Sequence, residues 1–203
     1  MKKLGAEFYQ RANVVCVAKD LLGKLLVTNF PDGHTSGRII EVEAYNGVVD
    51  KASHAYNGRR TKRTEHMYAA GGVAYVYLIY GIHSLFNVVT HLEENPHAIL
   101  IRAIEPVKGI PVMLKRMQKK NFDSSIGRGP GNLSKALGIS TLHTGMSLSG
   151  KEIYIADDNF EIKKSSIIEG PRIGVDYAAE DALLPYRFYV KENPHVSGQR
   201  KMT

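Results

Sequence analysis

The sequence predicts a single α+β domain with a mostly antiparallel, curved β-sheet, surrounding helices and a protruding β-hairpin. Three observations predict this fold. Strand-like runs dominate the centre of the chain, helical spacing is confined to a few short segments, and no pattern repeats at a fixed period. A length of 203 residues with 43% hydrophobic content suits one core. We therefore expect one domain over residues 1–203.

The first predicted element is a helix over residues 11–22. Its apolar side chains recur at helical spacing, and Gly23 follows where a left-handed cap would end the helix. Two strand-like runs come next, over residues 24–30 and 37–45, and a Pro-Asp-Gly turn cluster separates them. We expect these two strands to pair as a hairpin.

Three further strands form the centre of the predicted sheet. They span residues 73–80, 84–92 and 98–104, and they are rich in β-branched and aromatic side chains. Gly81 separates the first two strands, and a turn containing proline precedes the third. This order predicts an antiparallel meander.

The remaining predicted elements are shorter. A helix is expected over residues 108–118, and a turn-rich stretch leads to a second helix over residues 133–137 that ends at Gly138. Four short strands complete the prediction, over residues 151–157, 160–167, 171–177 and 186–192.

The composition indicates a polyanionic partner and an intracellular location. There are 27 Lys and Arg residues against 20 Asp and Glu, a formal net charge of +7, which favours nucleic acid as a partner. Cys16 is the single cysteine, so an internal disulfide is excluded, and we expect this residue in the core of a protein from a reducing compartment. No apolar run is long enough to span a bilayer. We expect a cytoplasmic, nucleoid-associated protein without membrane contact.

The strand over residues 37–45 alternates in polarity. Glu41, Glu43 and Tyr45 share one face. The opposite face carries Ile40, Val42 and Ala44. A solvated face is the ordinary interpretation of two such carboxylates. The segment that follows favours a functional site instead, because it places His54 and a dense group of positive charges soon after the two glutamates.

The basic segment predicts a contact with the DNA backbone. Its charged residues are Arg59, Arg60, Lys62 and Arg63. A basic loop beside a strand with carboxylates would let phosphates dock while a carboxylate faces a neutral sugar or base. A solvated run of charges is the alternative interpretation of this loop.

Tyrosines are concentrated in the same part of the chain. Six of the 11 tyrosines lie between residues 45 and 80, and tryptophan is absent. Tyr77 and Tyr80 stand three residues apart before Gly81, so one should point inward and the other towards the tip of a turn. An enzyme that extrudes a base needs both a stacking wall and a wedge.

These motifs together resemble the alkyladenine, or 3-methyladenine, DNA glycosylase family. The matching strings are IEVEAY with His54, then YVYLIYGIHSLFNVV, LIRAIEP, GPGNLSKALGI, PRIGVDYA and RFYV. They follow the family order from residue 40 to residue 190. The chain departs from the family pattern at Val42, Thr64 and Ile82, where we expect local differences in DNA contacts.

The resemblance implies a catalytic role for three positions. Glu43 corresponds to the general base that activates the attacking water. Arg102 and the backbone of Ile173 correspond to the groups that hold this water. We expect Arg102 to pair with Glu43 and to fix the geometry of its carboxylate.

The resemblance also implies a base pocket and a wedge. The pocket corresponds to Tyr45, His54, Tyr77, Asn87 and Ile173. The amide of Asn87 would crowd the 2-amino group of guanine. Tyr80 corresponds to the side chain inserted into the duplex, and Ile82 leans into the minor groove.

The implied activity is that of a monofunctional glycosylase acting on alkylated or deaminated purines, of the 3-methyladenine, 7-methylguanine and hypoxanthine type. A cationic purine is a good leaving group and is attracted to tyrosine faces, so one carboxylate suffices. A neutral lesion would need a hydrogen bond from the His54 amide or a water. No lysine falls within the matched site, and neither a metal nor a cofactor is expected.

Two rival functions remain open from the sequence. A non-catalytic nucleic-acid binder or lesion sensor would account for the charge and the tyrosines. A small-molecule transferase or hydrolase would act on free nucleosides and would bind with little dependence on salt. The leading hypothesis predicts damaged double-stranded DNA as the partner and a monomer as the working form.

Overall fold

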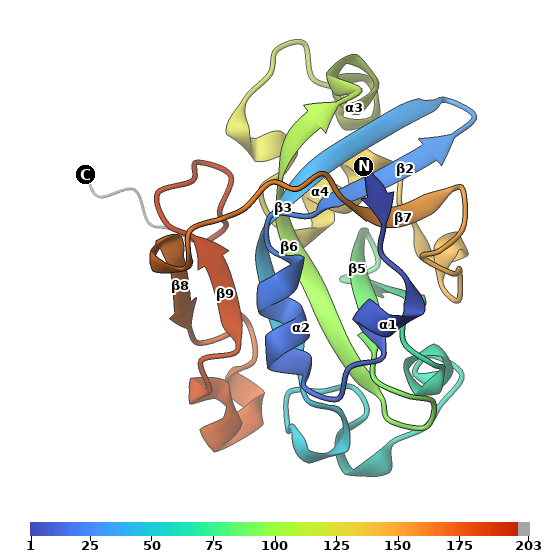
Figure 1. Cartoon of the computed structure of the whole chain (residues 1–203), viewed down its shortest axis with the longest axis vertical. Helices are drawn as coiled ribbons and strands as arrows, with labels where there is room; N and C mark the ends of the chain where they lie inside the picture. Colours follow the sequence, from blue (N-terminus) through green and yellow to red (C-terminus); the bar gives the residue numbers. More distant parts are fainter. Residues whose placement is uncertain (199–203) are drawn as a thin grey trace.

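The computed structural model describes residues 1–198, and one antiparallel sheet of nine strands runs through them (Figure 1). Its main path has the order β1-β7-β2-β3-β6-β5-β4, and β9 joins β3 with β8 beside it. The strands are β1 (Lys2–Lys3), β2 (Leu25–Phe30), β3 (Gly33–Tyr45), β4 (Ala74–Ile79), β5 (His83–Thr90), β6 (His97–Lys108), β7 (Ile153–Asp157), β8 (Ile167–Gly170) and β9 (Arg187–Val190). The α+β prediction is confirmed.

Strand β3 lies at the centre of this sheet. It pairs with β6 along most of its length, while its first half pairs with β2 and residues 41–43 pair with β9. Since β2 and β9 share one edge of β3, the strand is enclosed on both sides. Central position and full pairing explain why polar side chains of β3 are buried beside its apolar ones.

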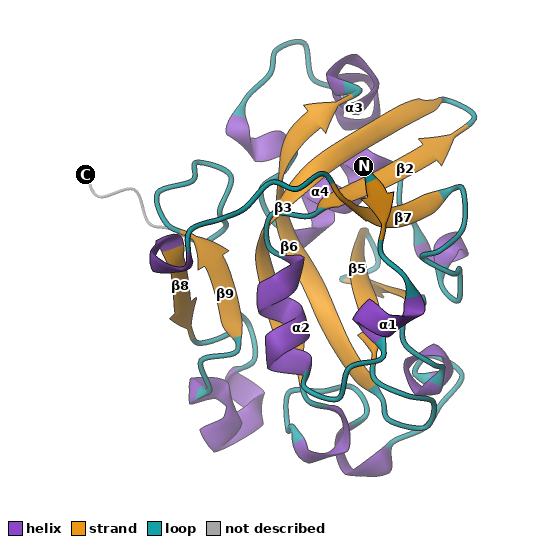
Figure 2. Cartoon of the chain, in the orientation of Figure 1, coloured by secondary structure: helices purple, strands orange, loops and turns teal. Residues whose placement is uncertain are grey.

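Four α-helices surround the sheet (Figure 2). They are α1 (Ala6–Tyr9), α2 (Val14–Leu21), α3 (Ile110–Met117) and α4 (Pro130–Leu137). Helix α2 begins where the Asn13 side chain accepts a hydrogen bond from the Cys16 amide at 3.0 Å, and Gly23 follows its end with a φ of +86°. Its buried face packs into the main core, whereas Cys16 is exposed, contrary to the prediction. In Figure 1, α2 lies in front of β3 and β6.

Short 3₁₀ helices occupy the connections. They are η1 (Gly47–Val49), η2 (Tyr56–Gly58), η3 (Glu65–Tyr68), η4 (Ser124–Ile126), η5 (Thr141–His143), η6 (Lys164–Ser166) and η7 (Asp176–Leu183). Within residues 1–198, no helix combines the length and the apolar character that crossing a membrane requires.

Most predicted elements are confirmed, but two predicted strands are wrong. Residues 160–166 form a connection that contains η6 and has no partner strand, even though Ile162 packs against the core; only Ile167, the last residue of the predicted strand, pairs with β9. Residues 171–175 form a loop that Gly174 bends with a φ of +74°, and residues 176 and 177 begin η7. The chain instead forms β8, which pairs with β9 and was not predicted, like β1 and α1.

Candidate active site

A β-bulge places the first charged side chain of the site. Glu41 pairs with Ala103, whereas its neighbour Val42 pairs with Ile101, so Arg102 is an extra residue on β6. A bulge re-aims a side chain relative to the regular alternation of a strand. The guanidinium of Arg102 is therefore directed onto the carboxylate-bearing face of β3.

Two buried carboxylates flank this guanidinium. Arg102 Nε lies 3.1 Å from Oε1 of Glu41, and Nη1 lies 3.2 Å from Oε1 of Glu43. Glu41 also accepts hydrogen bonds from Arg187 Nε at 2.7 Å and from the amide and hydroxyl of Ser197 at 2.6 and 2.9 Å. Two arginines thus compensate two carboxylates, and Glu41 has its acceptor positions filled.

Glu43 retains one free acceptor position. It accepts a hydrogen bond from the Ile173 amide at 2.8 Å and another from the Tyr45 hydroxyl at 2.9 Å, in addition to its contact with Arg102. A carboxylate offers about four lone-pair sites, so these three donors leave about one for a further proton donor. Burial and the nearby Glu43 charge raise the pKa of Tyr45 well above its usual range, so its hydroxyl remains a donor.

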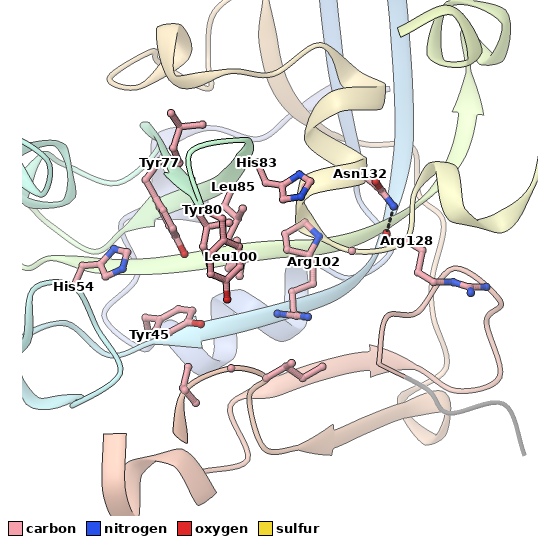
Figure 3. Close-up of a pocket in the computed structure, with 18 of the residues that line it drawn as sticks. Tyr45, His54, Tyr77, Tyr80, His83, Leu85, Leu100, Arg102, Arg128 and Asn132 are labelled. Atoms are coloured by element: carbon pink, nitrogen blue, oxygen red, sulfur yellow. Dashed lines mark hydrogen bonds between the residues drawn. The ribbon is translucent and has the colours of Figure 1, made fainter. Parts of the chain in front are cut away.

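An open cavity of about 600 Å³ lies above these groups. In Figure 3, Tyr45, His54 and Tyr77 lie at one end of the cavity, Tyr80 and Arg102 lie near its middle, and Arg128 and Asn132 lie at the other end. The lining includes Tyr45, His54, Arg63, Tyr77, Tyr80, Leu85, Leu100, Arg102, Arg128, Ile173 and Tyr177. The shape suits a flat aromatic ligand whose attached group faces Arg102.

A smaller cavity of about 30 Å³ continues behind the aromatic end. Asn87 forms part of its wall, is 3% exposed, and donates hydrogen bonds to the carbonyls of Tyr75 and Leu85 at 3.1 and 3.2 Å. These bonds fix the amide in one orientation. A base that entered deeply would therefore meet a rigid polar group at the end of the pocket.

His54 is a neutral side chain at this end of the cavity. Burial, and then the charges of Arg63 and Arg59, lower its pKa to about 4. Its Nδ1 lies 2.9 Å from the Tyr75 hydroxyl, and its ring meets the Tyr77 ring edge-on at 4.7 Å between centroids. The aromatic rings of this part of the pocket wall are consequently uncharged at neutral pH.

The β4–β5 hairpin carries the predicted wedge away from the sheet. Tyr80 and Gly81 both have positive φ, of 53° and 71°, as in the hairpin turns that match strand twist. A positive φ is uncommon for tyrosine and costs local strain. It leaves Tyr80 86% exposed and Ile82 73% exposed at the tip. Tyr77 and Tyr80 both line the cavity, but Tyr77 is half-buried.

All four basic residues of the predicted DNA-contacting loop are exposed, but they are not equivalent. Arg60 forms ion pairs with Glu65 and Glu94. Arg63 turns towards the cavity and lies over the Tyr77 ring. Thr64, a departure from the family pattern, is buried, and its hydroxyl donates to the loop backbone. This hydrogen bond from the buried Thr64 side chain therefore stabilises the loop.

The sequence did not indicate the support beneath Ile173. Arg172 is fully buried, contacts both oxygens of Asp50, and donates to the carbonyls of Ala44 and Asp181 at 3.0 Å each. Its guanidinium also lies 4.9 Å from the Tyr45 ring centroid. The pair therefore fixes both the Ile173 amide and one wall of the pocket. The sequence analysis treated Arg172 and Ile173 as part of a predicted strand, and nothing in that segment indicated a buried ion pair.

Among residues 1–198, no three His, Cys, Asp or Glu side chains are grouped closely enough to hold a metal ion. The arrangement instead offers one buried carboxylate with a free acceptor position, below an aromatic pocket.

Comparisons with known proteins agree with this arrangement. A family model described as "Methylpurine-DNA glycosylase (MPG)" matches residues 7–194. A protein of Desulfitobacterium hafniense (strain Y51) is 43% identical, with 97% of this chain and 99% of that protein covered. Proteins of Clostridium perfringens (strain 13 / Type A) and Clostridium acetobutylicum are 44% and 46% identical, with at least 96% of this chain and 98% of each protein covered.

Each of these three relatives bears the name "Putative 3-methyladenine DNA glycosylase". The family model matches most of the chain, and the relatives cover nearly all of it. The chain therefore belongs to the methylpurine-DNA glycosylase family.

Proposed function

We propose that this protein is a monofunctional DNA glycosylase of base excision repair, which excises alkylated or deaminated purines from duplex DNA. One observation carries the proposal. Glu43 is fully buried behind Tyr45, Arg102 and Ile173, which line the pocket, and it contacts all three. Its partners within residues 1–198 leave about one acceptor position. The names of the relatives agree with this activity.

The proposed reaction needs one water molecule and one carboxylate. Glu43 accepts a proton from the water as its oxygen bonds to the anomeric carbon of the deoxyribose, and the base departs with the electrons of the glycosidic bond. A cationic purine leaves as a neutral molecule. A neutral purine needs a hydrogen bond or a proton as it leaves. We propose the His54 amide, which donates no hydrogen bond within residues 1–198, for the former role.

The base must leave the duplex to reach this pocket. We propose that Tyr80 and Ile82 at the hairpin tip fill the space left in the base stack, and that Arg59, Arg60, Lys62 and Arg63 approach the phosphates. The partner is then damaged double-stranded DNA, bound by a monomer. The exposure of the hairpin tip supports this role.

Tyr80→Ala is expected to lower single-turnover base release at subsaturating protein by roughly tenfold to a hundredfold, because stacking on an aromatic side chain contributes about 1–3 kcal/mol. The free energy of unfolding should change by less than about 0.5 kcal/mol, since Tyr80 is 86% exposed. Tyr80→Phe keeps the ring and should behave like the wild type. Normal base release by Tyr80→Ala would refute the wedge.

The proposed function is tested by single-turnover incubation with duplexes that contain one 3-methyladenine or one hypoxanthine. Release of free base that leaves an abasic site is expected. Binding without release would favour the lesion sensor, and activity on free nucleosides would favour the small-molecule enzyme. Borohydride should trap no covalent adduct, because a trapped adduct would contradict the monofunctional reaction.

A further inference from the structure

Arg63 differs from the rest of its loop because its guanidinium lies against the pocket wall. Its Cζ is 4.8 Å from the centroid of the Tyr77 ring, and its Nη2 is 3.2 Å from Nε2 of His54. Both rings line the cavity beside Tyr45. A guanidinium at this distance is attracted to the electron-rich face of tyrosine. A cation is therefore already bound to the aromatic wall in the free protein.

The hydrogen bond to His54 fixes where the charge lies. His54 is neutral, so its Nε2 accepts from Arg63 and its Nδ1–H donates to the Tyr75 hydroxyl at 2.9 Å. The imidazole adds no charge of its own. Arg63 is the cation that contacts both rings at this end of the pocket, whereas Arg59 acts on His54 only through its charge.

Arg59 also acts on the His54 imidazole through its charge, but it is exposed to solvent. The remaining cations near the pocket are paired with carboxylates or lie at its far end. Arg102 is flanked by two buried carboxylates, and Arg172, under the pocket wall, is paired with Asp50. Arg128 lies at the opposite end of the cavity (Figure 3). Arg63 forms no ion pair with a carboxylate in the part of the chain that the structure describes. Its charge is thus uncompensated beside the base.

An uncompensated cation distinguishes the two chemical classes of damaged purine. A purine alkylated at N3 or N7 carries a positive charge, which Arg63 repels and which would share the Tyr77 ring with it. Hypoxanthine is neutral and stacks on the same rings without this repulsion. The free-energy difference acts on binding of the flipped base and is weakened by solvent, since Arg63 is exposed.

We propose that Arg63 is a specificity-determining residue that biases the pocket towards neutral purine lesions, such as hypoxanthine, and against cationic N-alkylpurines. This inference rests on the proposed function, and it deepens that function by naming the favoured class of substrate. It also assigns Arg63 a role in addition to the phosphate contact proposed for it and its neighbours.

The test compares single-turnover release of 7-methylguanine and of hypoxanthine from otherwise identical duplexes. Arg63→Gln should raise the ratio of 7-methylguanine to hypoxanthine release by roughly fivefold to tenfold, as expected for removing a partly screened charge near the base. Arg63→Lys retains the charge and should keep the ratio closer to that of the wild type. Lys62→Gln is the matched control, because it removes one exposed charge from the same loop.

Both glutamine variants should weaken binding to any duplex, since each removes one positive charge from the loop. Only Arg63→Gln should change the lesion ratio. An unchanged ratio in Arg63→Gln, or an equal change in Lys62→Gln, would overturn the specificity role while the glycosylase activity stands. Release of neither base by the wild type would refute the proposed function itself, and the specificity role with it.

Discussion

Glu43→Gln is expected to lower the single-turnover rate of base release by roughly 10²-fold to 10⁴-fold, the usual contribution of a general base. The glutamine carbonyl can still accept from the Ile173 amide at the position where Oε1 now lies, and its amide group can donate to the Tyr45 oxygen. The side chain therefore fits, but it cannot take a proton from water. Affinity for duplex with a lesion should remain close to that of the wild type.

Glu41→Gln is the matched control for this experiment. Glu41 lies two residues away on the same face of β3 and is equally buried, but its partners are Arg102, Arg187 and Ser197. Glu41→Gln should lower the free energy of unfolding. It should slow base release far less than Glu43→Gln does. If the two variants lose base release equally while both remain folded, Glu43 is not the base.

The centre of the fold could be predicted because its strands carry a clear two-residue period bounded by turn residues. Strands β4, β5 and β6 lie where residues 73–104 indicated them. The wrong strand over residues 160–167 shows the limit of this signal. Apolar residues there contact the core, but strand formation also needs a partner backbone, and no pattern within one segment specifies its partner.

The candidate site could be predicted in its residues but not in its geometry. Alternation correctly placed Glu41 and Glu43 on one face of β3. It failed for Ile40, which packs with Ala103 and Val196 rather than in the main core, because the pairing with β6 is irregular there. The bulge at Arg102 is likewise a property of two strands together, so neither strand alone could reveal it.

The ion pair beneath the site was missed for a related reason. Asp50 and Arg172 are 122 residues apart, and each looks like an ordinary surface charge in its own segment. Only the folded chain brings the two side chains together as a buried ion pair. The sequence could therefore suggest the water-binding amide of Ile173 through resemblance, but not what holds that amide in place.

Arg172→Met is expected to lower the free energy of unfolding by about 3–5 kcal/mol, because it leaves a buried carboxylate without its cation. The Asp50 side chain is 1% exposed and would keep only the amides of Asn46 and Ala52 as donors, at 3.0 and 2.9 Å. Base release should fall as well. Ile173 follows Arg172 directly in the chain, so loss of the Arg172 contacts should displace the amide that donates to Glu43. Urea unfolding and single-turnover assays measure the two effects.

A partly exposed ion pair provides the control for burial. Arg38 also contacts both oxygens of an aspartate, Asp158, but their side chains are 15% and 27% exposed, so Arg38→Met should cost much less, about 1 kcal/mol. Adding Asp50→Asn to Arg172→Met removes the unpaired charge and should restore part of the stability. Base release should stay low in this double variant, because the neutral pair no longer anchors the Ile173 loop. Full recovery of both properties would mean that the buried pair neither positions Ile173 nor orients its amide towards Glu43.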